Sequence, residues 1–372
     1  MKIVIAGGGT GGHFYPGYVI AKKLDSQGDE VVFIVKKNDI SIPRLKIDDI
    51  PFVEMDITAF PRSLNPFSYI RFMLKLIKSL LLSKRIIEDF EPDIVFGTGS
   101  YVAFPIIFLA WLKKIPIFIH ESNSVFGIGN FLCGFFSKKI FLGLPIRNNI
   151  FAKKTELIGT PLRDFFNQQI DVNSIKEKFK IKDQIVITCF GGSQGSYNIN
   201  NAIYYFALRN KTESKKNIAL IHITGKNNYE DVKKRYEKAG ILDENIILLD
   251  YYENMNEIYE ISDLIISRSG ASTISELIYK QKPAILIPLL SAAKNHQMEN
   301  ARILFEKDAA LILKDDNKLP ENLMKNIDFI ISGNRLSVMK KGYSHINLPN
   351  PVKSAEAIIS SIKTEVQKIN QK

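Results

Sequence analysis

The chain has 372 residues and a formal net charge of +11, with 45% hydrophobic and 24% charged residues. That length allows two domains with cores of their own, and the composition excludes a disordered or fibrous protein. The basic excess favours an anionic partner such as a nucleic acid, a nucleotide or an acidic lipid surface, and the placement of the charges has to decide among these.

The sequence carries no sign of a disulfide framework, a secretion signal or a membrane span. Cys133 and Cys189 both lie in apolar runs, so we expect buried, reduced thiols. Lys2 leads into a strand-like pattern rather than the apolar core of a signal peptide. The longest uncharged apolar stretch, residues 101–112, is too short to cross a bilayer. We therefore expect a cytoplasmic protein that is not integral to the membrane.

Short apolar runs typical of strands alternate with helical stretches along the whole chain. In chain order, the predicted strands are residues 2–6, 31–36, 52–55, 94–96, 115–120, 139–142, 185–190, 219–224, 246–250, 264–267, 284–288 and 310–313. Helices between successive strands indicate βαβ units, and the near-continuous Ile, Val and Phe runs indicate parallel sheets covered on both faces.

The predicted fold class is therefore α/β, with two Rossmann-like parallel-sheet domains facing a central cleft. An apolar strand followed by a glycine-rich loop opens each half, at residues 2–12 and again at residues 185–196. We expect a first domain over residues 1–160 and a second over residues 161–345, with the last helix, about residues 350–369, packing back on the first. Ligands of such domains bind at the carboxyl ends of the strands.

The first glycine-rich loop ends in a histidine. In order, it contains Gly7, Gly8, Gly9, Thr10, Gly11, Gly12 and His13. Glycines bring bare N–H groups close to a phosphate, and a histidine beside that anion can act as a general base. The alternative is a histidine that only packs against or caps the helix, whose first turn we expect to hold Pro16.

The same glycines also fit the fingerprint of dinucleotide-binding folds, which is a weak signal on its own. An NAD site also needs an acidic residue at the end of the second strand, where this chain has Lys36 and Lys37. NAD is therefore disfavoured, and an NADP-dependent oxidoreductase stays open as a rival.

A second anion site is predicted in the second half. Gly270 is followed by residues that open a helix, namely Ala271, Ser272, Thr273, Ile274 and Ser275. Their amides and hydroxyls suit a diphosphate at the positive helix end, and Glu276 suits a ribose diol. A capping box of Thr273 and Glu276 is the structural alternative. Gln297, with its neighbours Asn295 and His296, suits a sugar's hydroxyls or is simply polar surface.

Polar residues also end a strand in the first half, at His120, Glu121, Ser122 and Asn123, and we expect them to face the cleft. Arg163, just past the predicted domain break, could close on a phosphate, although alone it would be an ordinary surface arginine.

Residues 66–89 form a predicted helix that is apolar on more than one side and edged by Arg71, Lys75, Lys78 and Arg85. That pattern is typical of a helix resting on an anionic membrane surface. A fully buried crossover helix is the alternative.

The sequence contains neither an Asp-x-Asp motif nor a Cys/His cluster, so we expect no metal and no cofactor. A leaving diphosphate would then be stabilised by helix N-termini and cationic side chains.

Together these motifs resemble the MurG family of glycosyltransferases. The resemblance rests on residues 8–13, 99–105, 120–123, 191–195, 268–271 and 275–276, which come in order over residues 1 to about 305. It implies a GT-B fold and an inverting transfer of N-acetylglucosamine from UDP-N-acetylglucosamine to lipid I. The product would be lipid II for peptidoglycan, made at the cytoplasmic face of the membrane by a peripheral protein with no nucleic-acid partner.

The resemblance also implies roles on the acceptor side. His13 would take the proton from the acceptor's C4 hydroxyl, and Thr10, Gly11 and Gly12 would face the transferred sugar and the acceptor diphosphate. Ser100, Ser122 and Thr160 depart from the family's pattern, which puts acceptor contacts rather than the fold in question.

On the donor side, the resemblance places Glu276 on the ribose, Tyr252 at the uracil end, and Gln297 and Asn123 on the sugar. The donor diphosphate would be bound by Arg163, Ser193 and the helix start at residues 271–275.

Two further functions stay open on the sequence. A related GT-B enzyme acting on diacylglycerol or another membrane lipid would share the donor motifs and the basic apolar helix. A non-enzymatic membrane adaptor that binds a nucleotide sugar would have no use for His13.

Overall fold

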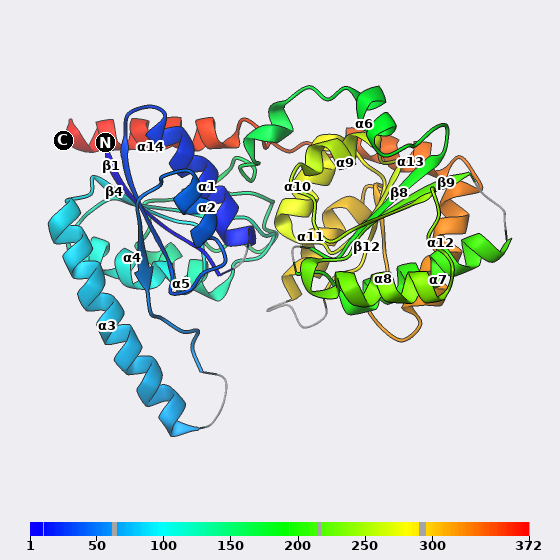
Figure 1. The fold of residues 1–372 in the computed structure, drawn as a ribbon. Coiled ribbons are helices and arrows are strands. Elements are labelled where there is room, and N and C mark those ends of the chain that lie inside the picture. Colours follow the sequence, from blue (N-terminus) through cyan, green and yellow to red (C-terminus); the bar gives the residue numbers. More distant parts are fainter. Residues whose placement is uncertain (10, 62–64, 193, 214–216, 290–294, 372) are drawn as a thin grey trace. The chain divides into compact units, whose positions relative to one another are not determined.

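The computed structural model describes all residues except 10, 62–64, 193, 214–216, 290–294 and 372. The chain divides into two compact units (Figure 1). The first unit comprises Met1–Asp164 together with Leu348–Lys372, and the second comprises Phe165–Asn347.

Within its described residues, the first unit holds a parallel sheet of seven strands in the order β3-β2-β1-β4-β5-β6-β7. The strands are β1 (Lys2–Ala6), β2 (Glu30–Lys36), β3 (Phe52–Met55), β4 (Ile94–Gly97), β5 (Ile117–Glu121), β6 (Lys139–Leu142) and β7 (Thr155–Leu157). The helices are α1 (Gly11–Asp25), α2 (Ile42–Ile47), α3 (Pro66–Phe90), α4 (Ala103–Leu112), α5 (Ile128–Phe136) and α14 (Ser354–Asn370).

Both faces of this sheet are covered, because successive side chains of a strand point to opposite faces. Ile3 and Ile5 of β1 join a cluster with α1 and α14, whereas Val4 and Ala6 join a cluster with α3, α4 and α5. Figure 1 shows α1 and α14 on one side of the sheet and α4 and α5 on the other. The continuous apolar runs of the strands are thus explained by burial on both sides.

The described part of the second unit holds a parallel sheet of six strands in the order β10-β9-β8-β11-β12-β13. The strands are β8 (Ile185–Phe190), β9 (Ile218–Ile223), β10 (Ile246–Leu249), β11 (Leu264–Ser267), β12 (Ala284–Leu286) and β13 (Ala310–Ile312). The helices are α6 (Val172–Lys178), α7 (Tyr197–Glu213), α8 (Tyr229–Lys238), α9 (Met255–Ile261), α10 (Ala271–Lys280), α11 (His296–Phe305), α12 (Leu319–Ile331) and α13 (Arg335–Gly342). Helices α7, α8 and α12 bury their apolar sides against one face.

The predicted α/β class with two parallel sheets is confirmed. Cys133 and Cys189 are free and buried, as expected, and burial raises the pKa of the Cys133 thiol to about 12. The short edge strand β7 was not predicted, because three residues leave no visible pattern. In the described residues, no helix is long and apolar enough to cross a membrane.

One local prediction is wrong. Pro16 does not lie in the first helical turn, because α1 begins at Gly11 and Pro16 is its sixth residue. A proline inside a helix leaves the carbonyl four residues earlier without its usual N–H donor. That carbonyl belongs to Gly12, and the hydroxyl oxygen of Ser122 lies 3.4 Å from it.

Candidate functional site

The first glycine-rich loop joins β1 to α1 and is in close contact with the neighbouring strand ends. Gly8 and Gly9 have φ values of 139° and 83°, which only glycine adopts readily. A Cβ on Gly8 would also lie 2.9 Å from the carboxylate of Asp39. Gly11 and Gly12 form the half-buried start of α1, whose first amides have no partner within the helix. Thr10 lies outside the described residues.

His13 is half-buried in the first turn of α1 and its ring is oriented by the backbone. Its Nδ1 lies 3.2 Å from the carbonyl oxygen of Thr98, which can only accept, so Nδ1 carries the proton and donates. The lone pair of the neutral ring is therefore on Nε2. The hydroxyl of Thr98 donates in turn to the carbonyl oxygen of His13, at 2.6 Å. Such an arrangement can accept a proton at a fixed atom.

The approach of this ring depends on Gly99, which follows Thr98 at the end of β4. Gly99 has a φ of 103°, and a Cβ there would lie 2.7 Å from Nδ1 of His13. Any other residue would therefore strain the backbone and displace the imidazole.

Asp39 contacts the first glycine-rich loop and was not predicted from the sequence to do so. Its buried carboxylate accepts from the N–H of Gly9 at 2.6 Å, and from the N–H and hydroxyl of Ser41 at 3.0 and 2.7 Å. It comes three residues after the end of β2, and the carboxyl ends of paired parallel strands lie together. An NAD site would have its acidic residue at the positions of Lys36 and Lys37, two to three residues before Asp39.

The polar residues at the end of β5, from His120 to Asn123, are not presented to a ligand as expected. His120, Glu121 and Ser122 are fully buried, with at most 2% of each side chain exposed. Glu121 accepts four hydrogen bonds of 3.0 Å, from the backbone N–H groups of Asn123 and Gly127 and from the side-chain amides of Asn123 and Asn130. The expectation that these residues face a cleft is therefore wrong for Glu121, which holds its own loop together.

His120 has a comparable internal role. Its Nε2 lies 3.1 Å from the carbonyl oxygen of Gly159 and donates to it, and its Nδ1 lies 3.3 Å from the hydroxyl of Ser122. Burial lowers the pKa of His120 to about 4, with partial compensation from the bond to Gly159. His120 is thus a neutral connector between β5 and the segment after β7.

Asn123 and Arg163, the other predicted binding residues of the first unit, are both half-buried. The amide of Asn123 is turned toward Glu121, with Nδ2 donating over 3.0 Å. The guanidinium of Arg163 lies over the ring of Tyr15 on α1, 4.7 Å from its centroid. This stacking places a cation beside the helix that carries His13.

In the second unit, the predicted anion site lies at the start of α10. Gly270 precedes the helix with extended backbone angles, and Ile274 is the first residue recorded to donate back to it, at 3.0 Å. Ala271, Ser272 and Thr273 therefore begin the helix with amides that have no intrahelical acceptor. Ser275 is buried.

Glu276 is oriented by a buried tyrosine. The hydroxyl of Tyr259 on α9 donates to Oε2 of Glu276 at 2.9 Å, and the two side chains are 0% and 8% exposed. The N-cap of α10 is Gly270 rather than Thr273, so the predicted alternative of a capping box of Thr273 and Glu276 is wrong. A hydrogen bond from a neutral donor fixes the carboxylate while leaving it an acceptor for a diol.

Gln297 lies at the start of α11, next to the strand end that carries Ser269. The hydroxyl of Ser269 donates to the carbonyl oxygen of Gln297 at 2.8 Å, and Oε1 of Gln297 accepts from the N–H of Leu289 at 2.9 Å. The preceding Arg268 bonds to the hydroxyl of Ser196 and forms an ion pair with Asp315, both at 2.7 Å. The second glycine-rich loop and the α10 loop are thus joined. Ser193, in that glycine-rich loop, lies outside the described residues.

Tyr252 follows β10 and lies in a small polar cluster. Its hydroxyl donates to Glu257 and accepts from Nζ of Lys178 at 2.7 Å, and its ring lies 5.8 Å from that of Phe179. Partial burial and the hydrogen bond to Glu257 raise the pKa of Tyr252. The side chain of Tyr252 is half-buried.

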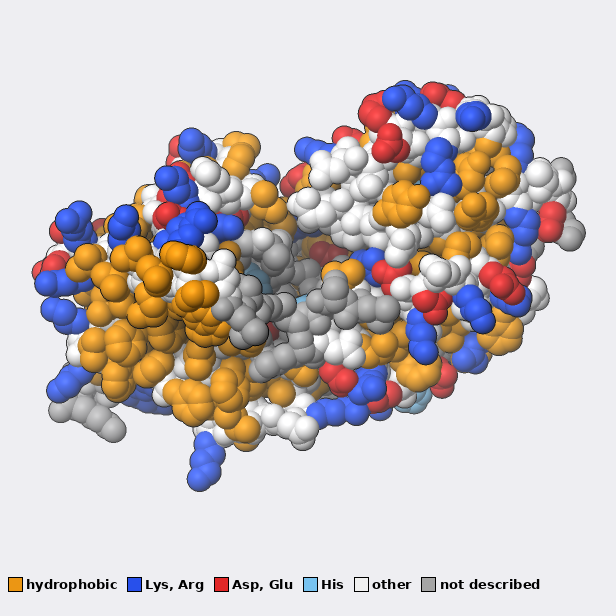
Figure 2. Space-filling view, turned by 90° about the horizontal axis from the view of Figure 1, so that it is seen from below, with side chains coloured by type: hydrophobic (Ala, Val, Ile, Leu, Met, Phe, Trp, Pro, Cys, Tyr) orange, Lys and Arg blue, Asp and Glu red, His pale blue; other side chains and the backbone are white. Residues whose placement is uncertain are grey.

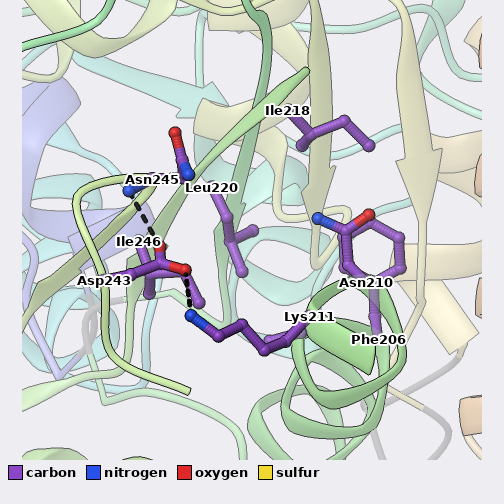
Figure 3. Close-up of a pocket in the computed structure, with 9 residues that line it drawn as sticks. Phe206, Asn210, Lys211, Ile218, Leu220, Asp243, Asn245 and Ile246 are labelled. Atoms are coloured by element: carbon purple, nitrogen blue, oxygen red, sulfur yellow. Dashed lines mark hydrogen bonds and ion pairs between the residues drawn. The ribbon is translucent and has the colours of Figure 1, made fainter. Parts of the chain in front are cut away.

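The second unit also has a cavity of about 290 Å³ that is unrelated to these loops (Figure 3). It lies at the amino ends of β9 and β10, beside Ile218 and Ile246. Lys211 of α7 and Asp243 line this cavity and form an ion pair with each other, with Nζ and Oδ2 2.9 Å apart. Because ligands of parallel α/β sheets bind at the carboxyl ends of the strands, this cavity is not the predicted site.

The first unit presents a broad apolar surface on α3, α4 and α5. The exposed residues are Phe67, Ile70, Met73, Leu74, Ile77 and Leu81 on α3, Trp111 and Leu112 on α4, and Ile128, Leu132 and Phe135 on α5. We call this set the apolar face. Figure 2 shows hydrophobic side chains gathered over this side of the first unit, with Lys and Arg around them. The alternative of a fully buried helix at residues 66–89 is therefore wrong.

Across the residues that the structure places, no group of three or more His, Cys, Asp or Glu side chains could hold a metal ion.

Comparison with known families gives two matches that together span most of the chain. Residues 3–142 match the N-terminal domain of glycosyltransferase family 28, and residues 186–349 match its C-terminal domain. Both glycine-rich loops lie inside these matched regions.

Full-length relatives and a solved structure agree with this match. The chain is 37% identical over 367 residues to UDP-N-acetylglucosamine--N-acetylmuramyl-(pentapeptide) pyrophosphoryl-undecaprenol N-acetylglucosamine transferase of Elusimicrobium minutum, covering 98% of this chain and 99% of the relative. It is 36% identical to the transferase of that name from Thermodesulfovibrio yellowstonii, with 92% of each covered. The crystal structure of Acinetobacter baumannii MurG superposes with a TM-score of 0.76 at 26% identity, covering 98% of this chain and 99% of that one.

Proposed function

This chain belongs to the MurG family within glycosyltransferase family 28, and on that premise we propose that it transfers N-acetylglucosamine from UDP-N-acetylglucosamine to lipid I. Lipid I is the N-acetylmuramyl-(pentapeptide) pyrophosphoryl-undecaprenol of the relatives' names, and the product is lipid II. The observation that carries the proposal is His13, a base with its free lone pair at a defined atom, in a chain similar to the Elusimicrobium minutum transferase over 98% of its length.

The chemistry is a single displacement. The acceptor's C4 hydroxyl oxygen forms a bond to the anomeric carbon of the donor sugar while the bond from that carbon to the β-phosphate oxygen breaks. Nε2 of His13 takes the hydroxyl proton, and UDP leaves with the bonding electron pair. One displacement inverts the configuration at the anomeric carbon. Gly11, Gly12 and Thr10 hold the acceptor diphosphate near His13.

The second unit binds the donor. Glu276, oriented by Tyr259, accepts from the ribose hydroxyls, and the free amides at the start of α10 stabilise the leaving diphosphate. We assign further diphosphate contacts to Ser193 and Arg163, sugar contacts to Gln297 and Asn123, and the uracil to Tyr252. The stabilisation of the leaving group requires only amides and cations, so the proposed reaction proceeds without a metal.

The test is a transfer assay with labelled UDP-N-acetylglucosamine in detergent and EDTA, with and without lipid I. We expect label in a lipid-linked disaccharide only when lipid I is present. Transfer to diacylglycerol in a parallel reaction, with lipid I ignored, would replace the acceptor. NADPH-dependent absorbance changes would instead support an oxidoreductase, and sugar binding without transfer to either lipid would support an adaptor.

We further propose that the apolar face rests on an anionic membrane, where an undecaprenyl lipid would be found, so that the protein acts peripherally at the cytoplasmic side. The support is the exposure of Ile70 at 57%, Leu74 at 57% and Ile77 at 50%, next to the exposed Arg71. Apolar side chains with basic neighbours favour the interface of an anionic bilayer.

Replacing Ile70, Leu74, Ile77 and Leu81 by Ser tests this membrane contact. The variant should sediment less with phosphatidylglycerol vesicles while keeping its unfolding temperature, because these side chains are exposed. Leu76 and Leu80 are half-buried and would confuse the result with a loss of stability. Unchanged sedimentation of the folded variant would reject the contact.

A further inference from the structure

A cavity of about 390 Å³ opens beside α3 in the first unit, apart from the apolar face. Its lining includes Lys37, Glu54, Asp56, Lys78 and Ser79. These residues come from the carboxyl ends of β2 and β3 and from one flank of α3. The volume falls in the range of sites that take small ligands.

The cavity lies next to the glycine-rich loop. Asn38 also lines it, and the following residue, Asp39, accepts the hydrogen bond from Gly9. A substrate held by this loop therefore has the cavity as its neighbour on the β2 side.

The polar groups of the cavity are only partly used by the protein. In the described residues, no hydrogen bond or ion pair is recorded for the ammonium groups of Lys37 and Lys78, and both side chains are exposed. The hydroxyl of Ser79 is buried without a hydrogen-bond partner among those residues. Asp56 pairs with Lys75 at 2.6 Å, and Glu54 accepts from the N–H of Asn38 at 2.9 Å. Among the described residues, Lys37, Lys78 and Ser79 thus offer donors without a hydrogen-bond partner, and Lys37 also attracts the carboxylate of Asp56.

We propose that this cavity binds the peptide part of the acceptor, with Lys37 and Lys78 bonding to its terminal carboxylate. This inference rests on the proposed function, which supplies an acceptor with a lipid, a diphosphate and a peptide. The two flanks of α3 match the two ends of that molecule, since the apolar face suits the lipid and the cavity suits a polar chain. Glu54 and Asp56 are acceptors for peptide N–H groups.

The mixed charge of the lining favours a peptide over a lipid phosphate. A phosphate group offers only acceptors and would leave Glu54 and Asp56 without a donor, whereas a peptide offers N–H donors for these carboxylates and a carboxylate for the lysines. An ammonium binds a carboxylate through charge-assisted hydrogen bonds. The lysines therefore act as specificity residues for the stem of the acceptor, apart from the transfer chemistry at His13.

The experiment compares two acceptors in neutral detergent, where no anionic surface contributes. One is lipid I with its full pentapeptide, and the other carries only the first residue of the peptide. We expect the full-length protein to prefer the pentapeptide acceptor by about tenfold in kcat/KM, the size of one charge-assisted contact. The Lys37→Ala/Lys78→Ala variant should lose this preference by losing kcat/KM for the pentapeptide acceptor alone.

Lys84→Ala/Lys113→Ala is the matched control, because it also removes two exposed positive charges of the first unit but outside the cavity lining, and it should keep the preference. An equal loss on both acceptors would overturn the proposal, since the lysines would then serve the diphosphate or the sugar. An unchanged preference in the double variant, or none in the natural protein, would also overturn it. A defect seen only with phosphatidylglycerol vesicles would assign the cavity to a lipid phosphate instead. Failure of the natural protein to use either acceptor would contradict the proposed function itself.

Discussion

The two glycine-rich loops have the same local design and opposite chemical surroundings. Each follows the first strand of its sheet in chain order, β1 or β8, and leads into a helix. The first loop donates the N–H of Gly9 to the carboxylate of Asp39, whereas Ser196 at the end of the second accepts from the guanidinium of Arg268. The first loop is therefore held by an anionic side chain, Asp39, and the second by a cationic side chain, Arg268.

This difference separates the two halves of the proposed reaction. Beside the first loop, the carbonyl of Thr98 orients His13 so that Nε2 can accept a proton. Beside the second, the start of α10 and Glu276 offer groups for a diphosphate and a ribose. A glycine-rich loop after a strand therefore indicates where a ligand binds, whereas the side chains around the loop determine which chemical step or contact is possible there.

The largest loss of activity is expected from removing the imidazole of His13. His13→Ala should lower kcat by about 10²–10⁴-fold, the usual range for a general base, with an unchanged unfolding temperature. Initial rates with lipid I at saturating donor measure this effect. His345→Ala, at an exposed histidine of the second unit, is the control and should keep full activity. Turnover of His13→Ala at the natural rate would remove the base from this account.

The corresponding change in the second unit is Glu276→Gln, which keeps the shape and removes the charge. We expect the KM for UDP-N-acetylglucosamine to rise by about 10–100-fold, because hydrogen bonds to a charged group contribute about 1.5–3 kcal/mol. Tyr259→Phe should give a smaller rise, since it removes only the hydroxyl that orients Glu276. A larger effect of Tyr259→Phe than of Glu276→Gln would mean that the tyrosine itself binds the donor.

Titration of His120 should make the stability of the first unit depend on pH. Its pKa of about 4 in the folded protein lies below the usual 6.5, so the unfolded chain binds more protons between these values. Stability of the first unit should therefore fall as the pH drops from 6.5 toward 4, and the share of His120 at pH 5 is about 2 kcal/mol. Urea unfolding at pH 7.5 and 5, followed by the fluorescence of the single tryptophan, Trp111 on α4, reports on this unit.

His120→Gln should flatten this pH dependence, because glutamine does not titrate and can still donate to Gly159. An equally steep loss of stability in the variant would assign the acid sensitivity to other groups.

The smallest expected effect comes from Asp39. The carboxylate of Asp39 accepts from the N–H groups of Gly9 and Ser41 through different oxygens. In Asp39→Asn, one of these oxygens is replaced by an NH₂ group, which cannot accept. One of the two hydrogen bonds is therefore lost, and the loop should shift. We expect kcat/KM for lipid I to fall about tenfold, the equivalent of one net hydrogen bond, with the KM for the donor unchanged. Asp25→Asn, an exposed carboxylate at the end of α1, is the matched control. Equal kinetics for Asp39→Asn and its control would show that the carboxylate does not position the loop.

Strand positions were readable from the sequence where an apolar run ends in a clear break. The bounds of β1, β3, β6, β8 and β11 agree with the predicted ones, since each run stops at glycine, a turn or a charged residue. Internal contacts between strand ends were not readable. Asp39 meets Gly9 only because β1 and β2 pair in parallel, and nothing local marks that meeting.

At the end of β5, the sequence led to a wrong prediction of a site residue. A glutamate at a strand end looks like a site residue, yet Glu121 is satisfied by its own loop and is fully buried. The sequence does contain a hint of this role, because Asn123, Gly127 and Asn130 follow Glu121 closely and can donate hydrogen bonds to its carboxylate.

The division of labour between the two loops is tested most directly by calorimetric titration of UDP-N-acetylglucosamine into His13→Ala and Glu276→Gln. The account predicts that His13→Ala binds the donor within about twofold of the natural protein, while Glu276→Gln binds it at least about tenfold more weakly. Equal weakening in both variants, or natural affinity in Glu276→Gln, would contradict the assignment of the base to the first unit and the donor to the second.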